Sequence, residues 1–157
     1  MASNFTAVNP KVLSTPEPSG LPLLYEGVAN SKTWYKGQLG EKSSGLWQPI
    51  GTTGVTGPYC IFAEDQTTST SSSSAWVRHI EVGTRLEIYV ASGGSASAIG
   101  VANLGTKYGI RTASNIAYLD PAQNSNGDFE VEDLSARYEP IQNAAADTPG
   151  KCIVVLR

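Results

Sequence analysis

The chain has 157 residues, of which 40% are hydrophobic and 16% are charged, and its formal net charge is -3. This length suits one domain, or two small ones, with packed cores. The charge argues against nucleic acid as the main partner, because neutralising phosphates requires an excess of Lys and Arg. No apolar run approaches the roughly 20 residues that span a bilayer, and residues 1–10 lack the pattern of a secretory signal. We therefore expect neither a nucleic acid nor a membrane as partner.

Residues 1–22 are predicted to form an extended arm. The prolines that block a helix and disfavour a central strand are Pro10, Pro16, Pro18 and Pro22. Such an arm is either a disordered tail or a segment that orders on a neighbouring subunit. We expect contacts with other subunits rather than with its own domain, because the prolines reduce the entropy that is lost on ordering. The apolar side chains for this contact are Val8, Val12, Leu13 and Leu21.

From residue 23 onward the pattern predicts short strands separated by turns that contain Gly and Pro. The expected strands cover residues 23–28, 34–39, 45–50, 59–63, 84–90, 99–102, 108–112, 116–119, 129–132 and 151–156. Residues 84–90 alternate between apolar and polar side chains, which predicts a half-buried antiparallel strand. In the strand expected at 151–156, residues 152–156 are apolar throughout and fit burial on both faces. We therefore expect an all-β fold of antiparallel barrel or sandwich subdomains with little helix.

The expected organisation is an extended arm over residues 1–22, a β-domain over 23–92 and a second β-subdomain over 96–157 that packs on the first. The boundary is the Ser-Gly-Gly-Ser segment at 92–95, which offers flexible backbone and few side chains to pack. The Ser/Thr tract at 67–74 is typical of a mobile loop. Residues 132–146 remain ambiguous, because their apolar spacing also fits a short helix.

The motifs of nucleotide, metal and hydrolase chemistry are incomplete. Gly100 and Gly105 have the spacing of a phosphate loop, but Thr106 precedes Lys107, which reverses the order that the motif requires. A calcium loop around Gly127 would have Ala122 at its first position, where a carboxylate is needed, and Asp133 in place of the bidentate Glu at its twelfth. His79 is the single histidine, and no Gly-x-Ser-x-Gly nucleophile turn occurs. We therefore expect no catalytic residue, no metal site and no cofactor.

The two cysteines, Cys60 and Cys152, lie in apolar strand-like runs and are expected to be buried free thiols.

Six carboxylates lie between residues 120 and 139. Paired carboxylates can hydrolyse glycosides, but Glu130 and Glu132 alternate with Phe129 and Val131. A solvated strand face is the simpler interpretation, and an acidic patch for a basic partner is the alternative.

Several segments resemble the head decoration, or cement, proteins of tailed bacteriophages. In the first half these are Trp-Tyr-Lys-Gly-Gln-Leu at 34–39, Gly-Leu-Trp-Gln-Pro at 45–49, Ile-Phe-Ala-Glu-Asp at 61–65 and Ile-Glu-Val-Gly-Thr-Arg-Leu-Glu at 80–87. In the second half they are Leu-Gly-Thr-Lys-Tyr-Gly-Ile at 104–110, Ala-Tyr-Leu-Asp at 117–120 and Phe-Glu-Val at 129–131. The resemblance covers about residues 23–157, and the Ser/Thr tract at 67–74 has no counterpart in it. It implies an all-β fold, homotrimers on the outer surface of the head, contact with the major capsid protein, and no catalytic residues.

We therefore expect a structural virion protein that stabilises the capsid lattice as an oligomer. The candidate interface residues are Val8, Val12, Leu13, Leu21, Trp34, Tyr35 and Trp47, since aromatic side chains are common anchors of interfaces. A small module that binds carbohydrate through Trp34, Tyr35 or Trp47 is the alternative. An enzyme that uses the carboxylates at 120–139 is a third hypothesis, for which no acid and nucleophile are paired at a recognisable spacing.

Overall fold

The computed structural model describes residues 9–51, 57–66, 70, 73–92, 95–96, 99–124, 127–134 and 150–157. In these ranges the named strands pair antiparallel, and the helical structure is a short 3-10 helix, η1 (Val101–Asn103). The all-β expectation is confirmed. No helix in the described ranges is long and apolar enough to cross a membrane.

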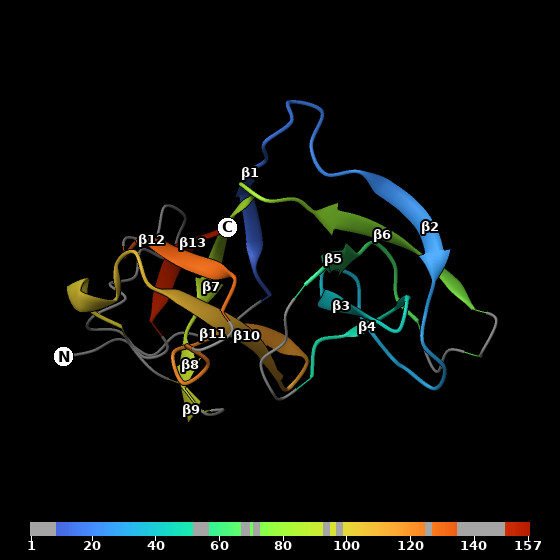
Figure 1. Ribbon diagram of the computed structural model, residues 1–157. Helices are drawn as coiled ribbons and strands as arrows, with labels where there is room; N and C mark the ends of the chain where they lie inside the picture. The colour runs from blue at the N-terminus through green and yellow to red at the C-terminus, as the bar shows by residue number, and fades with distance from the viewer. Residues whose placement is uncertain are drawn as a thin grey trace.

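One sheet has six strands and combines the start, middle and end of the chain (Figure 1). Its strands, in spatial order, are β1 (Lys11–Ser14), β7 (Arg85–Tyr89), β13 (Lys151–Leu156), β12 (Phe129–Asp133), β10 (Lys107–Ala113) and β11 (Ile116–Asp120). Strand β13 lies between β7 and β12 and is buried along its whole length, as the apolar run at 152–156 predicts, and the buried Lys151 at its start is paired with Glu87.

The second sheet has five strands. Its strands, in spatial order, are β2 (Leu23–Gly27), β6 (Ser74–Ile80), β5 (Tyr59–Phe62), β3 (Leu39–Ser43) and β4 (Leu46–Pro49). An isolated parallel bridge joins Val28, after β2, to Trp47 in β4, so the two edges of the sheet curl toward each other without a continuous ladder between them. A separate hairpin pairs β8 (Ala91–Ser92) with β9 (Ser95–Ala96).

Two hydrophobic cores lie on opposite faces of the five-stranded sheet. Successive residues of a strand point to opposite faces, and in β5 Tyr59 belongs to the core shared with the six-stranded sheet, whereas Cys60 and Phe62 belong to a second core inside the curl. Both cysteines are buried free thiols, as expected. Burial raises the pKa of each thiol well above its ordinary value.

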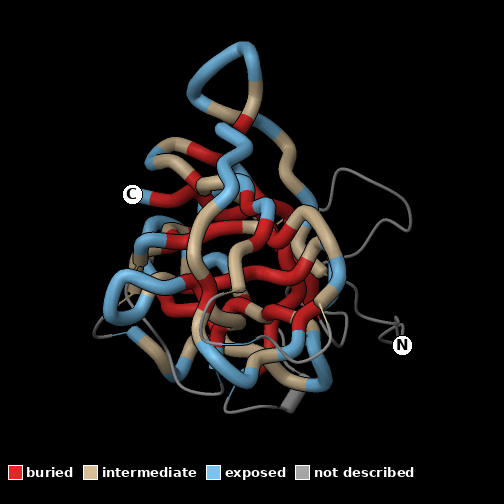
Figure 2. Tube along the Cα trace, turned by 90° about the vertical axis from the view of Figure 1, so that its right-hand side faces the viewer, coloured by how far each residue is buried: buried red, intermediate tan, exposed pale blue. Residues whose placement is uncertain are grey.

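The described residues of the expected arm, 9–22, are part of the folded domain. Strand β1 pairs with β7, Val12 packs against the shared core, and Leu21 is 8% exposed within that core. The expectation that this segment avoids its own domain is therefore wrong for β1 and Leu21. The physical reason is that the prolines flank residues 11–14, which keep their backbone donors for pairing at the sheet edge. Residues 16–19 form an exposed loop that extends away from the body of the molecule (Figures 1 and 2). Val8 lies outside the described residues.

The sheets cross the boundary expected at residues 92–95. Strand β7 precedes that boundary and pairs with β13, which follows it, while the hairpin β8–β9 spans the boundary itself. Long-range pairing of this kind leaves no local sequence signal.

Most of the Ser/Thr tract at 67–74 and most of the ambiguous segment at 132–146 lie outside the described residues, although Ser74 begins β6 and Asp133 ends β12.

Three of the strand predictions need correction. Trp34 forms an isolated bridge with Gln66, and residues 35–38 form a turn in which the Gln38 side chain accepts a hydrogen bond from the Tyr35 amide, so the strand begins only at Leu39. Residues 101–103 form η1 rather than a strand.

The β7 strand is not half-buried, because Glu87 and Tyr89 on its polar face are 1% and 3% exposed. Lys151 forms an ion pair with Glu87 and lies over the Tyr89 ring, which compensates the buried charge.

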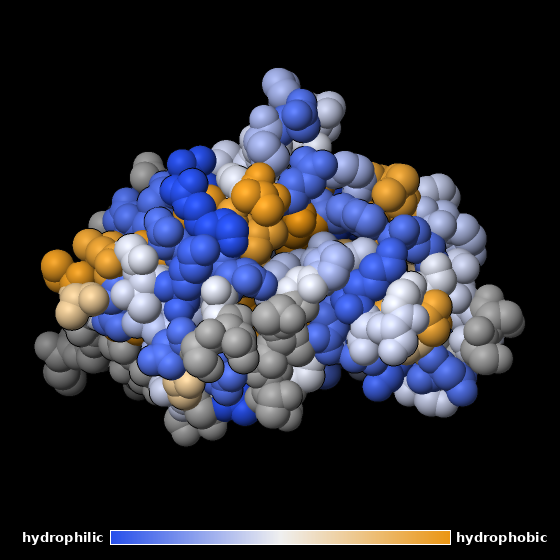
Figure 3. All heavy atoms as spheres, viewed as in Figure 1, coloured by the Kyte–Doolittle hydropathy of each residue, from blue (hydrophilic) through white to orange (hydrophobic). Residues whose placement is uncertain are grey.

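The visible surface is largely hydrophilic over the strands of the five-stranded sheet (Figure 3). Hydrophobic areas appear where the chain passes from β6 to β7, over the start of β2 and near η1. Large contiguous apolar patches on a protein surface mark contact sites. The exposed apolar side chains in these areas are therefore candidates for a contact site.

Candidate functional site

The aromatic residues chosen from the sequence separate into core and surface. Trp34 and Trp47 are fully buried in the second core, where Trp34 stacks on Phe62 with ring centroids 4.6 Å apart. Neither side chain can contact a protein or a sugar, so their burial excludes Trp34 and Trp47 from the candidate interface. Tyr35 is 51% exposed and remains a candidate interface residue.

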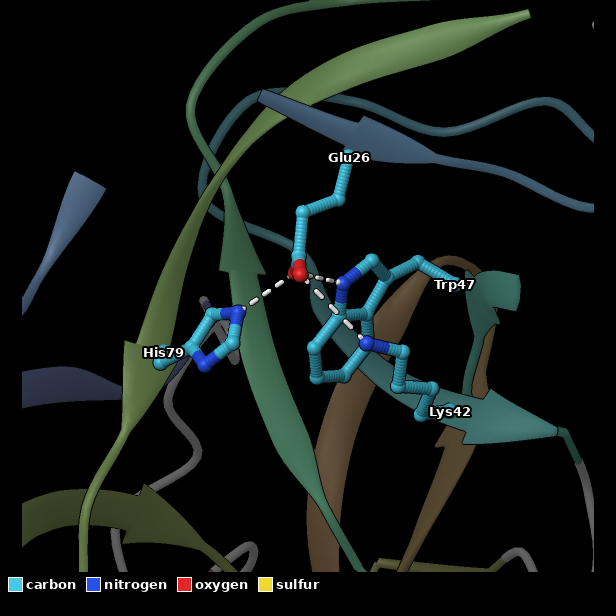
Figure 4. A network of polar contacts seen from close by, with 4 residues as sticks. All are labelled: Glu26, Lys42, Trp47 and His79. Carbon is cyan, nitrogen blue, oxygen red and sulfur yellow. Dashed lines mark hydrogen bonds and ion pairs between the residues drawn. The ribbon is translucent and has the colours of Figure 1, made fainter. Parts of the chain in front are cut away.

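Glu26 organises a network of polar side chains at the curl of the five-stranded sheet (Figure 4). Its carboxylate accepts a hydrogen bond of 2.6 Å from Trp47 Nε1 and lies 2.6 Å from His79 Nε2. Lys42 Nζ lies 3.4 Å from the same carboxylate. An ionised carboxylate only accepts hydrogen bonds, so Nε2 is the donor nitrogen of His79. The network ties β2, β3, β4 and β6 together.

This environment favours the ionised form of Glu26. The hydrogen bond from Trp47 is the largest cause that lowers the pKa of Glu26 to about 2, with His79 and Lys42 adding to it and partial burial opposing it. The lone pairs of the carboxylate are directed to fixed donors. A base or acid in catalysis would need access to a substrate proton, whereas the arrangement of Glu26 is suited to holding the sheet together.

A second cluster lies on the other face of β2 and β6. Tyr25 and Trp76 are directly opposite each other in the ladder, their ring centroids are 5.1 Å apart, and the rings are inclined by 45°. Tyr25 is 60% exposed and Trp76 is 45% exposed. Further along β6 the same face carries Ile80, which is buried in the shared core. One sheet face therefore begins in the core and ends as an uncovered aromatic surface.

Beside Trp76 the surface is hollowed to a volume of about 420 Å³. We name this feature the Trp76 hollow, and its lining residues are Leu23, Lys36, Gly37, Ile61, Phe62, Ala63, Glu64, Trp76 and Arg78. It combines aliphatic and aromatic side chains with charges of both signs. Such a mixture is typical of small-molecule sites, in which apolar walls supply contact area and a few polar groups supply orientation.

A second hollow of about 460 Å³ lies where the two sheets meet, beside the turn between β6 and β7. We name its surface the Val82 patch, and its residues are Gly57, Pro58, Tyr59, Ile80, Val82, Asp128, Leu156 and Arg157. Val82 is 69% exposed at the tip of the turn, and the amide of Gly83 donates a 2.8 Å hydrogen bond to the Leu156 carbonyl. Tyr59 Oη donates to Asp128 at 2.9 Å, so the walls of this hollow are fixed by internal contacts.

No family model, no curated protein and no solved structure matches this chain.

Three of the six carboxylates between residues 120 and 139, Glu130, Glu132 and Asp133, lie on β12, while Asp120 ends β11 and residue 139 lies outside the described residues. Glu130 lies 3.7 Å from Arg157, and Glu132 forms a 2.8 Å ion pair with Arg85. Glu132 is exposed and Glu130 is half-buried, while Phe129 and Val131 are buried on the opposite face, as their alternation predicts. Among the residues that the structure describes, no group of three or more His, Cys, Asp or Glu side chains could hold a metal ion.

Sequence reasoning missed Tyr25 and Trp76 as surface residues and Glu26 as the centre of a network. A signal for Trp76 does exist, because Ala75 and Val77 alternate with Trp76 and Arg78 across residues 75–78. That period of two places Trp76 on the face away from the small apolar side chains. The Glu26 network leaves no such signal, since its four residues come from four different strands.

Proposed function

We propose that this chain is a structural virion protein, a decoration protein that binds the outer surface of the major capsid lattice as a homotrimer. The observation that carries the proposal is the exposure of apolar side chains at two separate places on one small β-fold, Val82 at the turn between β6 and β7 and Val101 with Leu104 at η1. The identity of the partner rests on the resemblance in sequence to cement proteins of tailed phages.

The first patch is the Val82 patch, and the second is formed by Val101 and Leu104 at η1. Val101 is 74% exposed and Leu104 is 42% exposed. Asn103 holds η1 in place, since its side chain accepts from the Gly100 amide at 2.8 Å and donates to Tyr108 Oη at 2.6 Å. The exposed apolar side chains, Val82, Val101 and Leu104, therefore protrude from elements that are already ordered, which lowers the entropy lost on binding.

Two different patches on each subunit suit a ring. In a cyclic trimer every contact is heterologous, so one surface of a subunit meets a different surface of the next. We propose that the Val82 patch of one subunit contacts the Val101 patch of its neighbour, which leaves the remaining surface for the capsid.

The Glu26 network supports a structural role as well, because the single His of the chain is engaged with a carboxylate inside the sheet.

Light scattering during size-exclusion chromatography tests this arrangement. The wild-type protein is expected to elute as a trimer, and both Val82→Asp and Leu104→Asp are expected to be monomers, because each places a charge in one half of the contact. An equimolar mixture of the two variants still has one intact pair of patches and is expected to form a dimer that cannot close.

Leu46→Asp is the matched control, because Leu46 is 38% exposed on the β3–β4 hairpin, outside both patches. This variant is expected to remain a trimer. A monomeric wild-type protein, or trimers of Val82→Asp and Leu104→Asp that match the wild type, would refute the proposed contact.

A further inference from the structure

Trp76 and Tyr25 form an aromatic platform on a rigid support. The two residues face each other across the antiparallel pair β2–β6, and β6 is held on its other side by β5. Side chains on strands keep a more constant orientation than side chains on loops. Both rings are exposed even though their ring faces are apolar and would ordinarily be covered.

Polar groups surround the Trp76 hollow in fixed positions. Glu64 Oε1 accepts a 3.1 Å hydrogen bond from the Trp76 amide, which holds the carboxylate beside the indole. The Lys36 amide donates to Asp65 at 2.7 Å, so the loop that carries the Lys36 ammonium is anchored. Arg78 extends from β6 on the same face as Trp76, and its Nη1 lies 3.4 Å from the Leu21 carbonyl. Donors and an acceptor therefore lie around an apolar floor.

The size and charge of this hollow favour a small polar ligand over a protein. Its volume of about 420 Å³ lies within the range of roughly 300–1,000 Å³ found for ligand pockets. Three of its nine lining residues, Lys36, Glu64 and Arg78, are charged. The centres of protein interfaces are depleted of Lys and Glu, although Arg is common there, so Lys36 and Glu64 distinguish this hollow from a protein hot spot.

We infer that the Trp76 hollow binds carbohydrate, with a pyranose ring stacked on the indole of Trp76. One face of a pyranose presents C–H groups that pack on an aromatic ring, while its hydroxyls point outward in the plane of the ring. Lys36 and Arg78 are placed to donate to these hydroxyls, and Glu64 is placed to accept from them. Tyr25 extends the platform toward a second sugar unit. This site is separate from the two patches of the proposed trimer.

A glycan array probed with the purified wild-type protein, followed by calorimetric titration of the best oligosaccharide, tests the inference. Trp76→Ala is expected to weaken binding at least about tenfold, because a stacked aromatic anchor carries much of the energy of a small contact. Arg78→Ala is expected to weaken binding by a smaller factor, and it provides a second test if Trp76→Ala does not fold. Leu46→Ala is the matched control, since Leu46 is an exposed apolar residue outside the hollow, and it is expected to bind as the wild type does.

A blank array, or a titration in which Trp76→Ala and Arg78→Ala bind as tightly as the wild type, would overturn the inference. Binding of a protein partner that Trp76→Ala abolishes, with no glycan bound, would also overturn it and assign the hollow to a protein contact. The oligomeric state of the variants keeps this test apart from the proposed function, because Trp76→Ala and Arg78→Ala are expected to remain trimers.

Discussion

The carboxylate of Glu26 accepts a 2.6 Å hydrogen bond from the indole nitrogen of Trp47, and this contact joins strands at the two opposite edges of the five-stranded sheet. The backbone bridge between Val28 and Trp47 lies beside it. The curl that encloses the second core is therefore held by the side-chain contacts of Glu26 with Trp47 and Lys42 and by one bridge, rather than by a full ladder.

We expect Glu26→Gln to destabilise the fold by about 2 kcal/mol, in the range for hydrogen bonds to charged groups. Glutamine keeps the shape of the side chain but removes the charge that faces His79 and Lys42. Chemical denaturation of both proteins measures the difference. Glu132→Gln is the control, because its ion pair with Arg85 is exposed and is worth less than about 1 kcal/mol. Equal losses in the two variants would show that the network has no special role.

The stabilising effect of Glu26 should also depend on pH. Its pKa in the folded protein is about 2, below its ordinary value of 4.5. A carboxyl group with a lowered folded pKa stabilises the fold fully above its unfolded pKa and loses that effect as the pH falls through the folded pKa. The stability difference between wild type and Glu26→Gln is therefore expected to shrink as the pH falls from 4.5 to about 2. A difference that stays constant over this interval would contradict the assignment.

Gly40 in β3 is required by the second core. A Cβ at this position would lie 2.7 Å from Phe62 Cε2 and 2.8 Å from Cys60 Sγ. We expect Gly40→Ala to cost roughly 1–3 kcal/mol, as overpacking does in other cores, and thermal unfolding measures the loss. Gly100→Ala is the control, because a Cβ at Gly100 meets no atom within 4 Å. A Gly40→Ala protein as stable as this control would show that the core accommodates the methyl group.

Strand β1 is expected to contribute to stability, in contrast to the sequence-based expectation for the arm. A deletion of residues 1–14 removes the pairing with β7 and the contact of Val12 with the shared core. A deletion of residues 1–8 leaves β1 intact and is the matched control. We expect the longer deletion to unfold at a clearly lower temperature than the shorter one, because it exposes an edge of the six-stranded sheet. Identical unfolding temperatures would show that β1 is dispensable.

Local patterns predicted the all-β class, because alternation and turn residues act over a few positions. The alternation of Phe129 and Val131 with two glutamates predicted the orientation of β12, and the run at 151–156 predicted a buried strand. The pairing of β1 with β7 and of β7 with β13 could not be predicted, since these partners are distant in the chain. The burial of Trp34 and Trp47 could not be predicted for the same reason, whereas the alternation across residues 75–78 is a local signal for the exposure of Trp76.

Binding to capsids tests the proposed function most directly. Purified protein is mixed with undecorated capsids of its own source and sedimented, and the bound protein is quantified against the major capsid protein. A decoration protein is expected to co-sediment, to saturate at a fixed ratio to the capsid protein, and to raise the temperature at which the capsids disrupt. Protein that remains in the supernatant at saturating concentration, with capsid stability unchanged, would contradict the proposal.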